Sequence, residues 1–452
     1  MGDGWSISYG ELDARVSAAA RRLEELGVSP GERVALYLPK SAGYLILLLA
    51  LVRYGAVACP VSTRVPVGGV GPLLETAGCA ALISADDKLF GAVEKVDLLD
   101  PQVVLAVTVE DEKPSETAEM PLDRRATVVF TSGSTGAPKA ALHTFGNHYS
   151  NALGSNANIP LAPGDRWLHS LPLYHVGGLS IVFRCLVAGA AIALPEPGAP
   201  LGRSIRELRA THVSLVSTQL LRLLNGDADL SGLKAALMGG GPIPTFLVDG
   251  ALARDVPVHT SYGLTEMASQ VTATPAGASR EKLRTAGRVL PHREARVSGE
   301  GEILVRGETL FAGYLREDGP DLPLDDGGWF RTGDLGEMDA DGYLRVLGRR
   351  DNLFVSGGEN VRPEEIEEAL LRIPGVEEAV VVPVPDAEFG HRPVAFVRLS
   401  GAAGDLAGAL GPVLPRFKIP KTFHDWEGAA GMKPDRAALK ERANRLAGGE
   451  VP

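Results

Sequence analysis

Short apolar segments alternate with helix-like patterns at the start of the chain, and this alternation restricts the fold more than any other feature. The segment SYGELDARVSAAARRLEELG (8–27) opens with a capping-box spacing and carries apolar residues at helical intervals. ERVALYL (32–38) then predicts a strand, the apolar run Tyr44–Arg53 a buried helix, and AVACPVS (56–62) another strand. Continuous apolar strands separated by helices are typical of α/β proteins with layered sheets.

Two changes of pattern divide the rest of the chain. Strand-like segments continue after residue 120, and after residue 285 short Gly- and Asp-rich strands predict a small antiparallel or barrel-like subdomain, namely GEILVRG, GYLREDG, GWFRTGD and GYLRVLGRRDN. Beyond Asp351 a helix, PEEIEEALLRI, is followed by two strands and a Gly/Ala-rich helix near Leu406–Leu414. A chain of 452 residues is too long for one core. We expect two domains, one at 1–350 and an α+β domain at 351–452, joined at the polar GRRDN segment.

Composition excludes several partners. The chain has 45 Lys and Arg against 56 Asp and Glu and no dense basic block, so we expect no nucleic-acid partner. Cys59, Cys79 and Cys185 lie in apolar surroundings, which suits a reducing compartment. The N-terminus resembles no signal peptide, and the longest apolar run, Tyr44–Val52, is too short for a membrane span. We therefore expect a cytoplasmic protein; the composition is compatible with a homo-oligomer.

The segment TSGSTGAPK follows the apolar strand ATVVF, as a phosphate-binding loop should. It lacks the G-x-x-x-x-G-K-[ST] spacing of the P-loop. The glycines of TSGSTGAPK permit close backbone approach, its hydroxyl groups can donate to phosphate oxygens, and its lysine adds a positive charge. The alternative is a Ser/Gly surface turn. The candidate phosphate ligands are Thr131, Ser132, Gly133, Ser134, Thr135, Gly136 and Lys139.

This loop resembles the signature loop of the adenylate-forming superfamily, which includes acyl- and aryl-CoA synthetases, luciferases and adenylation domains of peptide synthetases. Further matches follow in the order of that family: LPLYH, MGGGP, SYGLTE, WFRTGD, LGRRDN, SGGENVRPEEIE and FKIPK. These segments are spread along nearly the whole chain. The resemblance implies ATP and Mg²⁺ as cofactors and coenzyme A as co-substrate.

On matching positions the resemblance implies a nucleotide site. Tyr262 would stack on adenine, Thr265 and Glu266 would reach the α-phosphate and Mg²⁺, and Asp334 would accept hydrogen bonds from both ribose hydroxyls with Arg349 beside it. As alternatives, Glu266 would be a solvated loop carboxylate, and Asp334 and Arg349 plain turn residues. The remaining nucleotide-binding candidates are Ser261, Gly263, Gly239, Gly240 and Gly241.

The resemblance also implies a change of domain orientation between two half-reactions. Lys433 would contact the carboxylate and the α-phosphate during adenylation, although GMKPDR has Met432 where the family usually has glycine. Rotation of a mobile domain 351–452 about Asp351, relative to the adenylating domain 1–350, would then withdraw Lys433. The same rotation would bring Ser356–Asn360, which includes Gly357 and Gly358, toward the thiol channel. An acyl-adenylate would form with release of pyrophosphate, and a thiol would then displace AMP. His175 would gate the acyl and CoA channel; the alternative is a core histidine.

Several segments resemble the o-succinylbenzoate–CoA ligases of menaquinone synthesis, namely HTFGNHY, GGLSIVFRCLVAGA and VSTQLLRLL. Arg184 lies within an apolar helical run, where a charge is costly unless paired. It would meet either a buried protein acid or the second carboxylate of such a substrate. Ser217, Thr218 and Gln219 would add hydrogen bonds to the acid.

Three other functions remain open. A different aryl- or acyl-CoA synthetase would use the same mechanism on another acid. A peptide-synthetase domain would need an acidic residue for the amino group, and no FD pair follows LPLYHVGGLS. A binding module that has lost catalysis would be expected to lack Glu266, Asp334 or the lysine, all of which are present.

Overall fold

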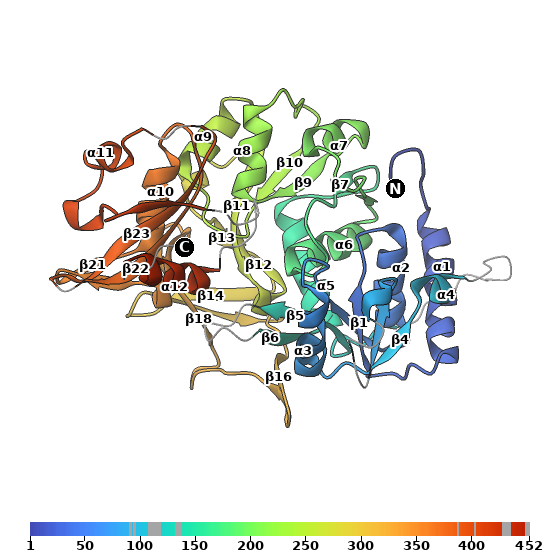
Figure 1. Ribbon diagram of the computed structural model, residues 1–452. Coiled ribbons are helices and arrows are strands. Elements are labelled where there is room, and N and C mark those ends of the chain that lie inside the picture. The colour runs from blue at the N-terminus through green and yellow to red at the C-terminus, as the bar shows by residue number, and fades with distance from the viewer. Residues whose placement is uncertain are drawn as a thin grey trace.

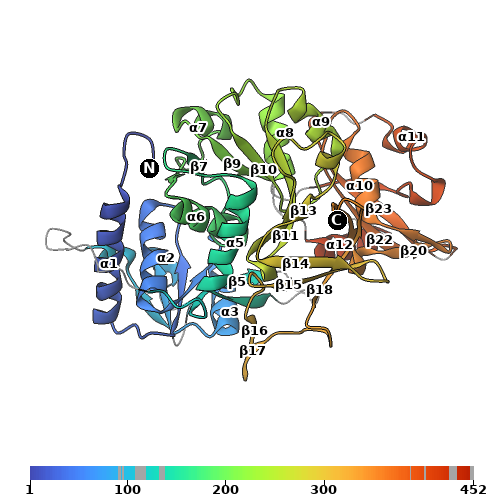
Figure 2. The same cartoon turned by 180° about the vertical axis from the view of Figure 1, so that it is seen from behind.

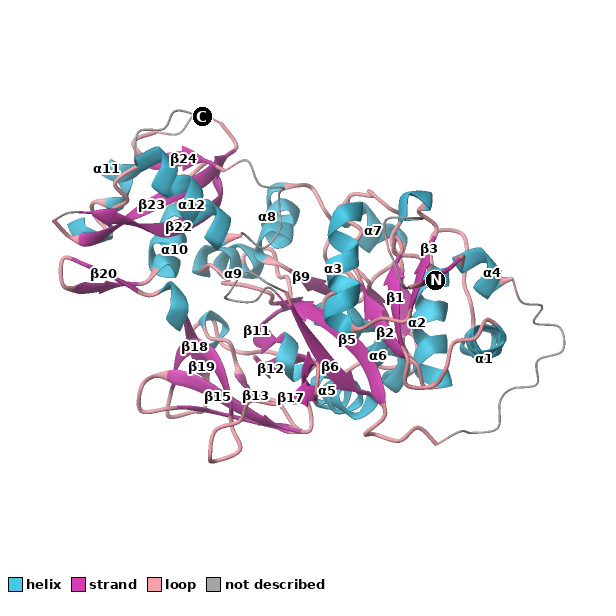
Figure 3. Cartoon of the chain, turned by 60° about the horizontal axis from the view of Figure 1, so that its bottom comes forward, coloured by secondary structure: helices cyan, strands magenta, loops and turns pink. Residues whose placement is uncertain are grey.

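The computed structural model describes residues 1–89, 93, 96–106, 119–131, 138–386, 388–401, 404–426 and 435–447. Within these residues the strands pair in four sheets, and helices lie between and outside them (Figure 3). The predicted first helix, strand and second helix are present as α1 (Tyr9–Glu25), β1 (Arg33–Tyr37) and α2 (Ala42–Tyr54). Ser8 caps α1, because its Oγ accepts the backbone N–H of Glu11 at 3.1 Å.

The first sheet has β1 near its centre, hydrogen-bonded in parallel to β2 and β3. Its described order is β17 (Gly319–Asp321), β16 (Gly313–Arg316), β6 (Lys139–Thr144), β5 (Arg125–Thr131), β2 (Val57–Pro60), β1, β3 (Ala81–Ser84) and β4 (Asp97–Leu99). Its apolar strands are buried on both faces: α1 and α2 share one core with it, and α3 (Val67–Ala77) shares the other. Near one edge lies the short α4 (Pro101–Leu105).

The second sheet faces the first across a shared core that contains α2 and α6 (Val176–Ala188). Its described order is β13 (Arg288–Val289), β12 (Ser269–Ala273), β11 (Val258–Leu264), β10 (Ala235–Met238), β9 (His212–Leu215), β7 (Arg166–Leu168) and β8 (Ala191–Ala193). Its far face is covered by α7 (Leu201–Glu207), α8 (Ser217–Asn225) and α9 (Thr245–Leu252). Helix α5 (Phe145–Asn158) packs beside α6 and contacts β12.

The third sheet is antiparallel, as the pattern after residue 285 predicts, but one expected strand is not part of it. Its described order is β14 (Arg293–Val297), β15 (Glu302–Gly307), β18 (Phe330–Met338) and β19 (Leu344–Arg349). The GYLREDG segment instead forms β16, which pairs with β6 of the first sheet. Assigning it to the subdomain was therefore wrong. The pairing with β6 joins residues that lie far apart in the sequence, so the local strand pattern does not reveal it. Gly313, with a φ of +130°, lets β16 pass close to β17, where a Cβ would lie 2.7 Å from Asp321 O.

The fourth sheet is formed by the C-terminal part of the chain. Its described strands are β21 (Glu359–Val361), β20 (Phe354–Ser356), β23 (Gly390–Leu399) and β22 (Val376–Asp386), with β24 (Phe423–Asp425) parallel to β23. One face packs on α10 (Pro363–Leu371) and α11 (Leu406–Leu410), and the other on α12 (Arg436–Ala447). The predicted Gly/Ala-rich helix is thus shorter than expected. Figures 1 and 2 show this part beside α8, α9 and the third sheet and far from α1.

Among the described helices, none combines the length and apolar character needed to cross a membrane. Cys59, Cys79 and Cys185 are buried and free.

Candidate active site

The predicted phosphate loop begins and ends on paired strands. Thr131, the last residue of β5, lies opposite Lys139, the first residue of β6, in an antiparallel pair. Ser132, Gly133, Ser134, Thr135 and Gly136 lie outside the described residues. The chain therefore continues after Pro138 into a strand and not into a helix. Both ends of the loop are therefore held side by side in the first sheet.

Tyr314 and His143 bring the predicted phosphate and metal residues together. The Tyr314 hydroxyl donates to Glu266 Oε1, and Lys139 Nζ lies 4.9 Å from the centre of the Tyr314 ring. His143 Nε2 lies 2.7 Å from the carbonyl oxygen of Thr265. Burial and then the nearby Glu266 raise the pKa of Tyr314, so its hydroxyl remains a donor. Lys139, Thr265 and Glu266 thus lie around one tyrosine that was not recognised in the sequence, where a single Tyr after FAG gives no functional signal.

Asp334, Arg349 and Tyr262 form a polar cluster, which we call the ribose cradle. β18 and β19 place Asp334 opposite Arg349, and Arg349 Nη1 donates to Asp334 Oδ1 at 3.1 Å. From the second sheet, Tyr262 Oη donates to Asp334 Oδ2 at 2.6 Å. Burial and then the charge of Asp334 raise the pKa of Tyr262, which keeps its hydroxyl protonated. A carboxylate has about four acceptor positions, so Asp334 retains capacity for a pair of ribose hydroxyls.

The glycines of the predicted adenine site lie at the carboxyl ends of neighbouring parallel strands, β10 and β11, the usual position of ligands in α/β sheets. Gly240 has a φ of +82°. A Cβ on Gly239 would lie 2.9 Å from Ser261 Oγ, and one on Gly263 would lie 2.1 Å from Ser269 O. Ser261 Oγ in turn donates to Met238 O at 2.7 Å. Gly241 continues this segment. The glycines therefore permit close backbone packing beside Tyr262.

His175 immediately precedes α6 and is exposed. Its ring centre lies 4.7 Å from that of Tyr174. A buried core histidine, the alternative that the sequence left open, does not describe this residue. The tight start of α6 follows from Gly178, where a Cβ would lie 2.0 Å from Pro172 O.

Arg184 is buried, with 1% of its surface exposed. Its Nη2 donates to Gln270 Oε1 at 2.7 Å, and its guanidinium lies 5.1 Å from the centre of the Trp167 ring. Its Nε and Nη1, and Nε2 of Gln270, are buried and have no hydrogen-bond partner within the described structure. Of the two alternatives from the sequence, pairing with a protein acid finds no support in the described ion pairs. Arg184 is paired with an uncharged amide.

Arg293 brings a second buried guanidinium to Gln270. It donates to Gln270 O and, at 2.9 Å, to Pro291 O. Burial lowers the pKa of Arg184 and that of Arg293 to about 9, and for Arg293 the charge of Arg184 adds to this effect. Two neighbouring cations thus share an amide residue that sequence analysis missed, because one Gln in the strand SQVTA follows no pattern. We call Arg184, Gln270 and Arg293 the buried guanidinium cluster.

Ser217, Thr218 and Gln219 begin α8 and differ in their partners. Ser217 Oγ donates to Pro242 O at 2.7 Å, and Gln219 Oε1 accepts the backbone N–H of Val216 at 3.1 Å. These two side chains hold the start of α8 against the glycine-rich segment. Thr218 Oγ1 is buried with no hydrogen-bond partner within the described structure.

The C-terminal candidates lie on the turn between β20 and β21. Gly357 and Gly358 have φ values of +59° and +86°, and the backbone N–H of Gly357 donates to Phe389 O at 2.9 Å. Asp351 lies in the single turn Arg350–Asn352 with 56% of its side chain exposed. Lys433 and Met432 lie outside the described residues.

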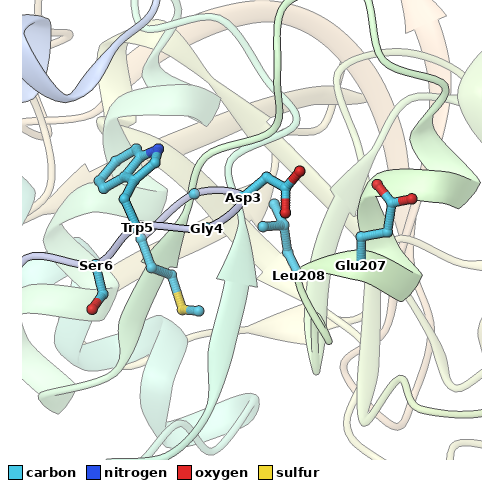
Figure 4. A pocket seen from close by; sticks show the side chains of 8 residues that line it. Asp3, Gly4, Trp5, Ser6, Glu207 and Leu208 are labelled. Carbon is cyan, nitrogen blue, oxygen red and sulfur yellow. The ribbon is translucent and has the colours of Figure 1, made fainter.

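Figure 4 shows a surface pocket of about 340 Å³ at the N-terminus of the chain. It is lined by the first six residues together with Glu207 and Leu208. None of the residues predicted for the active site contributes to it. This pocket is therefore separate from the site described above.

Comparison with known sequences identifies relatives along most of the chain. The model of the AMP-binding enzyme family matches residues 1–315, and that of the AMP-binding enzyme C-terminal domain matches residues 365–426. The 2-succinylbenzoate–CoA ligase of Oceanobacillus iheyensis is 35% identical over 438 residues, covering 93% of this chain and 91% of that protein. The ligase of the same name from Salmonella typhimurium is 37% identical over 442 residues, covering 96% and 92%.

Solved structures of similar chains share this fold. The o-succinylbenzoate CoA synthetase of Bacillus subtilis in complex with the acyl-adenylate OSB-AMP superposes with a TM-score of 0.86 at 30% identity, covering 100% of this chain and 95% of that one. Its complex with ATP and magnesium gives 0.85 at 31% identity, covering 98% and 95%. A double mutant bound to the product analogue OSB-NCoA gives 0.71 at 31% identity with the same coverage. The predicted class, a large layered α/β part followed by a small C-terminal α+β part, is confirmed.

Proposed function

The chain belongs to the AMP-binding enzyme family, and we propose that it is an AMP-forming ligase that joins o-succinylbenzoate to coenzyme A in menaquinone biosynthesis. ATP and Mg²⁺ are its cofactors and coenzyme A its co-substrate. Both curated relatives are named for this activity, and their alignments cover more than 90% of this chain. The resemblance inferred from the motifs therefore agrees with relatives found independently of them.

The buried guanidinium cluster is the observation that carries the choice of acid. Arg184 has two unpartnered donor atoms, and its one recorded side-chain acceptor is an amide. A carboxylate would satisfy a guanidinium with two parallel hydrogen bonds and would supply the charge that the cluster lacks. o-Succinylbenzoate has two carboxylates, one for activation and one for this cluster. Thr218, with its buried unpartnered hydroxyl, is the best supported of the three proposed α8 ligands.

The first half-reaction follows from the positions of the phosphate residues. A carboxylate oxygen of the acid attacks the α-phosphorus of ATP, and the bond to the β-phosphate breaks, so pyrophosphate leaves toward the loop between Thr131 and Lys139. Glu266, whose carboxylate accepts a hydrogen bond from Tyr314, would hold Mg²⁺, which would neutralise phosphate charge. Thr265 and Lys433 would contact the α-phosphate, and Asp334 would fix the ribose. In the second half-reaction the sulfur of coenzyme A attacks the acyl carbon and AMP leaves.

We infer that residues 1–350 and 351–452 are two domains that rotate about Asp351. The side chains that flank Asp351 form hydrogen bonds with different parts of the chain. Arg350 Nη1 donates to Glu302 in the third sheet at 3.1 Å, whereas Asn352 Nδ2 donates to Glu364 of α10 at 2.7 Å. A pivot at Asp351 would leave both anchors intact. Gly357 and Gly358 would then approach the thiol channel near His175.

Three free, buried cysteines fit a reducing compartment, and we propose a cytoplasmic location on that ground.

Mass spectrometry of the products tests the proposed function. The protein is incubated with Mg·ATP, coenzyme A and a panel of acids: o-succinylbenzoate, benzoate, coumarate, malonate and medium-chain fatty acids. A dominant o-succinylbenzoyl-CoA product with AMP is expected. Another thioester would keep the mechanism and overturn the substrate, and no thioester from any acid would contradict the ligase activity.

A further inference from the structure

A small polar cluster joins α9, which covers the second sheet, to α10 in the C-terminal part of the chain. Arg372 Nη2 donates to Thr245 Oγ1 at 2.9 Å, and Thr245 Oγ1 donates to Glu368 Oε1 at 3.3 Å. Arg372 Nη2 also donates to Glu368 Oε1 at 2.7 Å, which closes a triangle of three side chains. Thr245 precedes Arg372 by 127 positions. The cluster therefore connects two parts of the chain that the proposed pivot at Asp351 separates.

A second contact between α10 and the larger part of the chain lies close to the pivot. A Cβ built on Gly348 of β19 would lie 2.7 Å from Glu364 Oε2, and Glu364 also accepts from Asn352. Contacts near a pivot move little when a domain rotates, whereas those at a distance must break. Thr245 belongs to α9, which is outside the hinge segment, so its contacts with α10 depend on the orientation of the two parts.

We propose that Thr245, Glu368 and Arg372 form an interdomain latch that stabilises the adenylating orientation and opens before thioester formation. This proposal rests on the proposed function, because it assigns a role within the two half-reactions. The orientation is inferred from the superpositions: this chain resembles the OSB-AMP complex more than the OSB-NCoA complex. The three residues act by positioning the domains, and none of them contacts the reacting atoms.

The strength of the latch suits this role. Arg372 and Glu368 are about half exposed, at 54% and 41%, so their ion pair is weak and screened by salt. A weak contact still changes the populations of two orientations that are close in free energy, and it can open in every turnover. A strong buried ion pair in this place would trap one orientation.

The test compares two variants with a matched control. Thr245→Val keeps the shape of the side chain and removes both hydrogen bonds of the hydroxyl; Arg372→Met removes the guanidinium. Arg15→Met is the control, because Arg15 forms the same i,i+4 ion pair with Glu11 at 2.6 Å and similar exposure, within α1 alone. Adenylation is measured by acid-dependent ATP–pyrophosphate exchange, and thioester formation by adding acyl-adenylate and coenzyme A.

Both latch variants should lower the exchange rate by about two- to tenfold without slowing thioester formation, and the control should change neither. Equal loss in both half-reactions, no loss, or the same loss in Arg15→Met would overturn the latch.

A second measurement does not depend on activity. Spin labels at Leu122→Cys and Val413→Cys, both exposed positions, report the distance between the two parts of the chain. Thr245→Val should shift or broaden the distance distribution relative to the wild-type protein, and an unchanged distribution would overturn the latch. If no acid is activated but Thr245→Val still shifts the distance distribution, the proposed function is wrong. The interdomain latch is then supported as a contact between the two parts, but not as part of a half-reaction.

Discussion

The ribose cradle and the buried guanidinium cluster are both built around charged side chains, but they balance charge in opposite ways. In the cradle, the anion Asp334 accepts from Tyr262 and from the cation Arg349. In the cluster, the cations Arg184 and Arg293 share Gln270, which carries no charge. The protein itself thus balances the charge at the proposed nucleotide end of the site. At the proposed acid end, no described ion pair compensates the positive charge.

This difference separates common chemistry from choice of substrate. Every acid activated with ATP requires the same ribose contacts, so a preformed cradle serves all of them. An uncompensated buried cation favours a ligand that brings a carboxylate and disfavours one that leaves the charge buried. Specificity therefore follows from what the cluster lacks, and the predictions below test that interpretation.

The largest effect is expected for Lys433, which is proposed to contact both the carboxylate of the acid and the α-phosphate. Lys433→Ala should lower acid-dependent ATP–pyrophosphate exchange by about 10²- to 10³-fold, because a positioned cation no longer stabilises charge developing on the α-phosphate. Thioester formation from supplied acyl-adenylate should remain unchanged. Equal losses in the two assays would show that Lys433 does not act in adenylation specifically.

Arg184→Met should lower kcat/KM for o-succinylbenzoate by about 10²-fold, because the second carboxylate loses its cation. Turnover of benzoate, if the wild-type enzyme accepts it at all, should not fall, and stability should stay level or rise since a buried unpaired charge is removed. Steady-state kinetics and denaturant unfolding measure the two quantities.

Arg293→Met is the matched control for this prediction. Arg293 donates to backbone carbonyl oxygens, including those of Gln270 and Pro291, so its replacement removes several charge-assisted hydrogen bonds. Stability should fall by about 1–3 kcal/mol. If both variants lose stability and neither changes the preference for the dicarboxylate, the cluster is structural and the comparison fails.

These expectations show which parts of the site the sequence could reveal. Arg184 was predictable because a charge in an apolar helix breaks a local pattern, and Asp334 because RTGD is a contiguous motif. Gln270 and Tyr314 were not predictable, since their importance arises from partners 86 and 48 positions away. The same holds for β16, whose pairing with β6 depends on contacts across the fold and not on local strand propensity. Local pattern identified α1, α2, α10 and several strands, whereas long-range pairing determined how the strands are arranged.

Tyr262→Phe should weaken the cradle without affecting the acid end. Removal of the hydroxyl takes one donor from Asp334, and a charge-assisted hydrogen bond of this kind contributes about 1.5 kcal/mol, so KM for ATP should rise about tenfold. KM for o-succinylbenzoate should change less than twofold. A comparable rise in both values would mean that the two ends are coupled.

The smallest effect concerns the aromatic stack that physically connects the two ends. His143, whose Nε2 contacts Thr265 O, lies 5.3 Å from the His148 ring, and His148 stacks at 4.5 Å on Phe183, the neighbour of Arg184. Burial lowers the pKa of His143 to about 4, so the unfolded chain binds more protons between about pH 4 and 6.5. Stability should therefore decrease as pH falls through this window, by roughly 0.7 kcal/mol between pH 7 and 6 from His143 alone.

His143→Gln retains an N–H donor for Thr265 O and removes the titrating ring, so it should flatten this dependence in urea unfolding at pH 6, 7 and 8. Neutral His143 provides no electrostatic coupling between the ribose cradle and the buried guanidinium cluster. Tyr262→Phe and Arg184→Met should therefore have additive effects on kcat/KM in the double variant. A slope unaltered by His143→Gln would show that the histidine is not held neutral by burial. Non-additive kinetics would show that the stack couples the cradle to the guanidinium cluster.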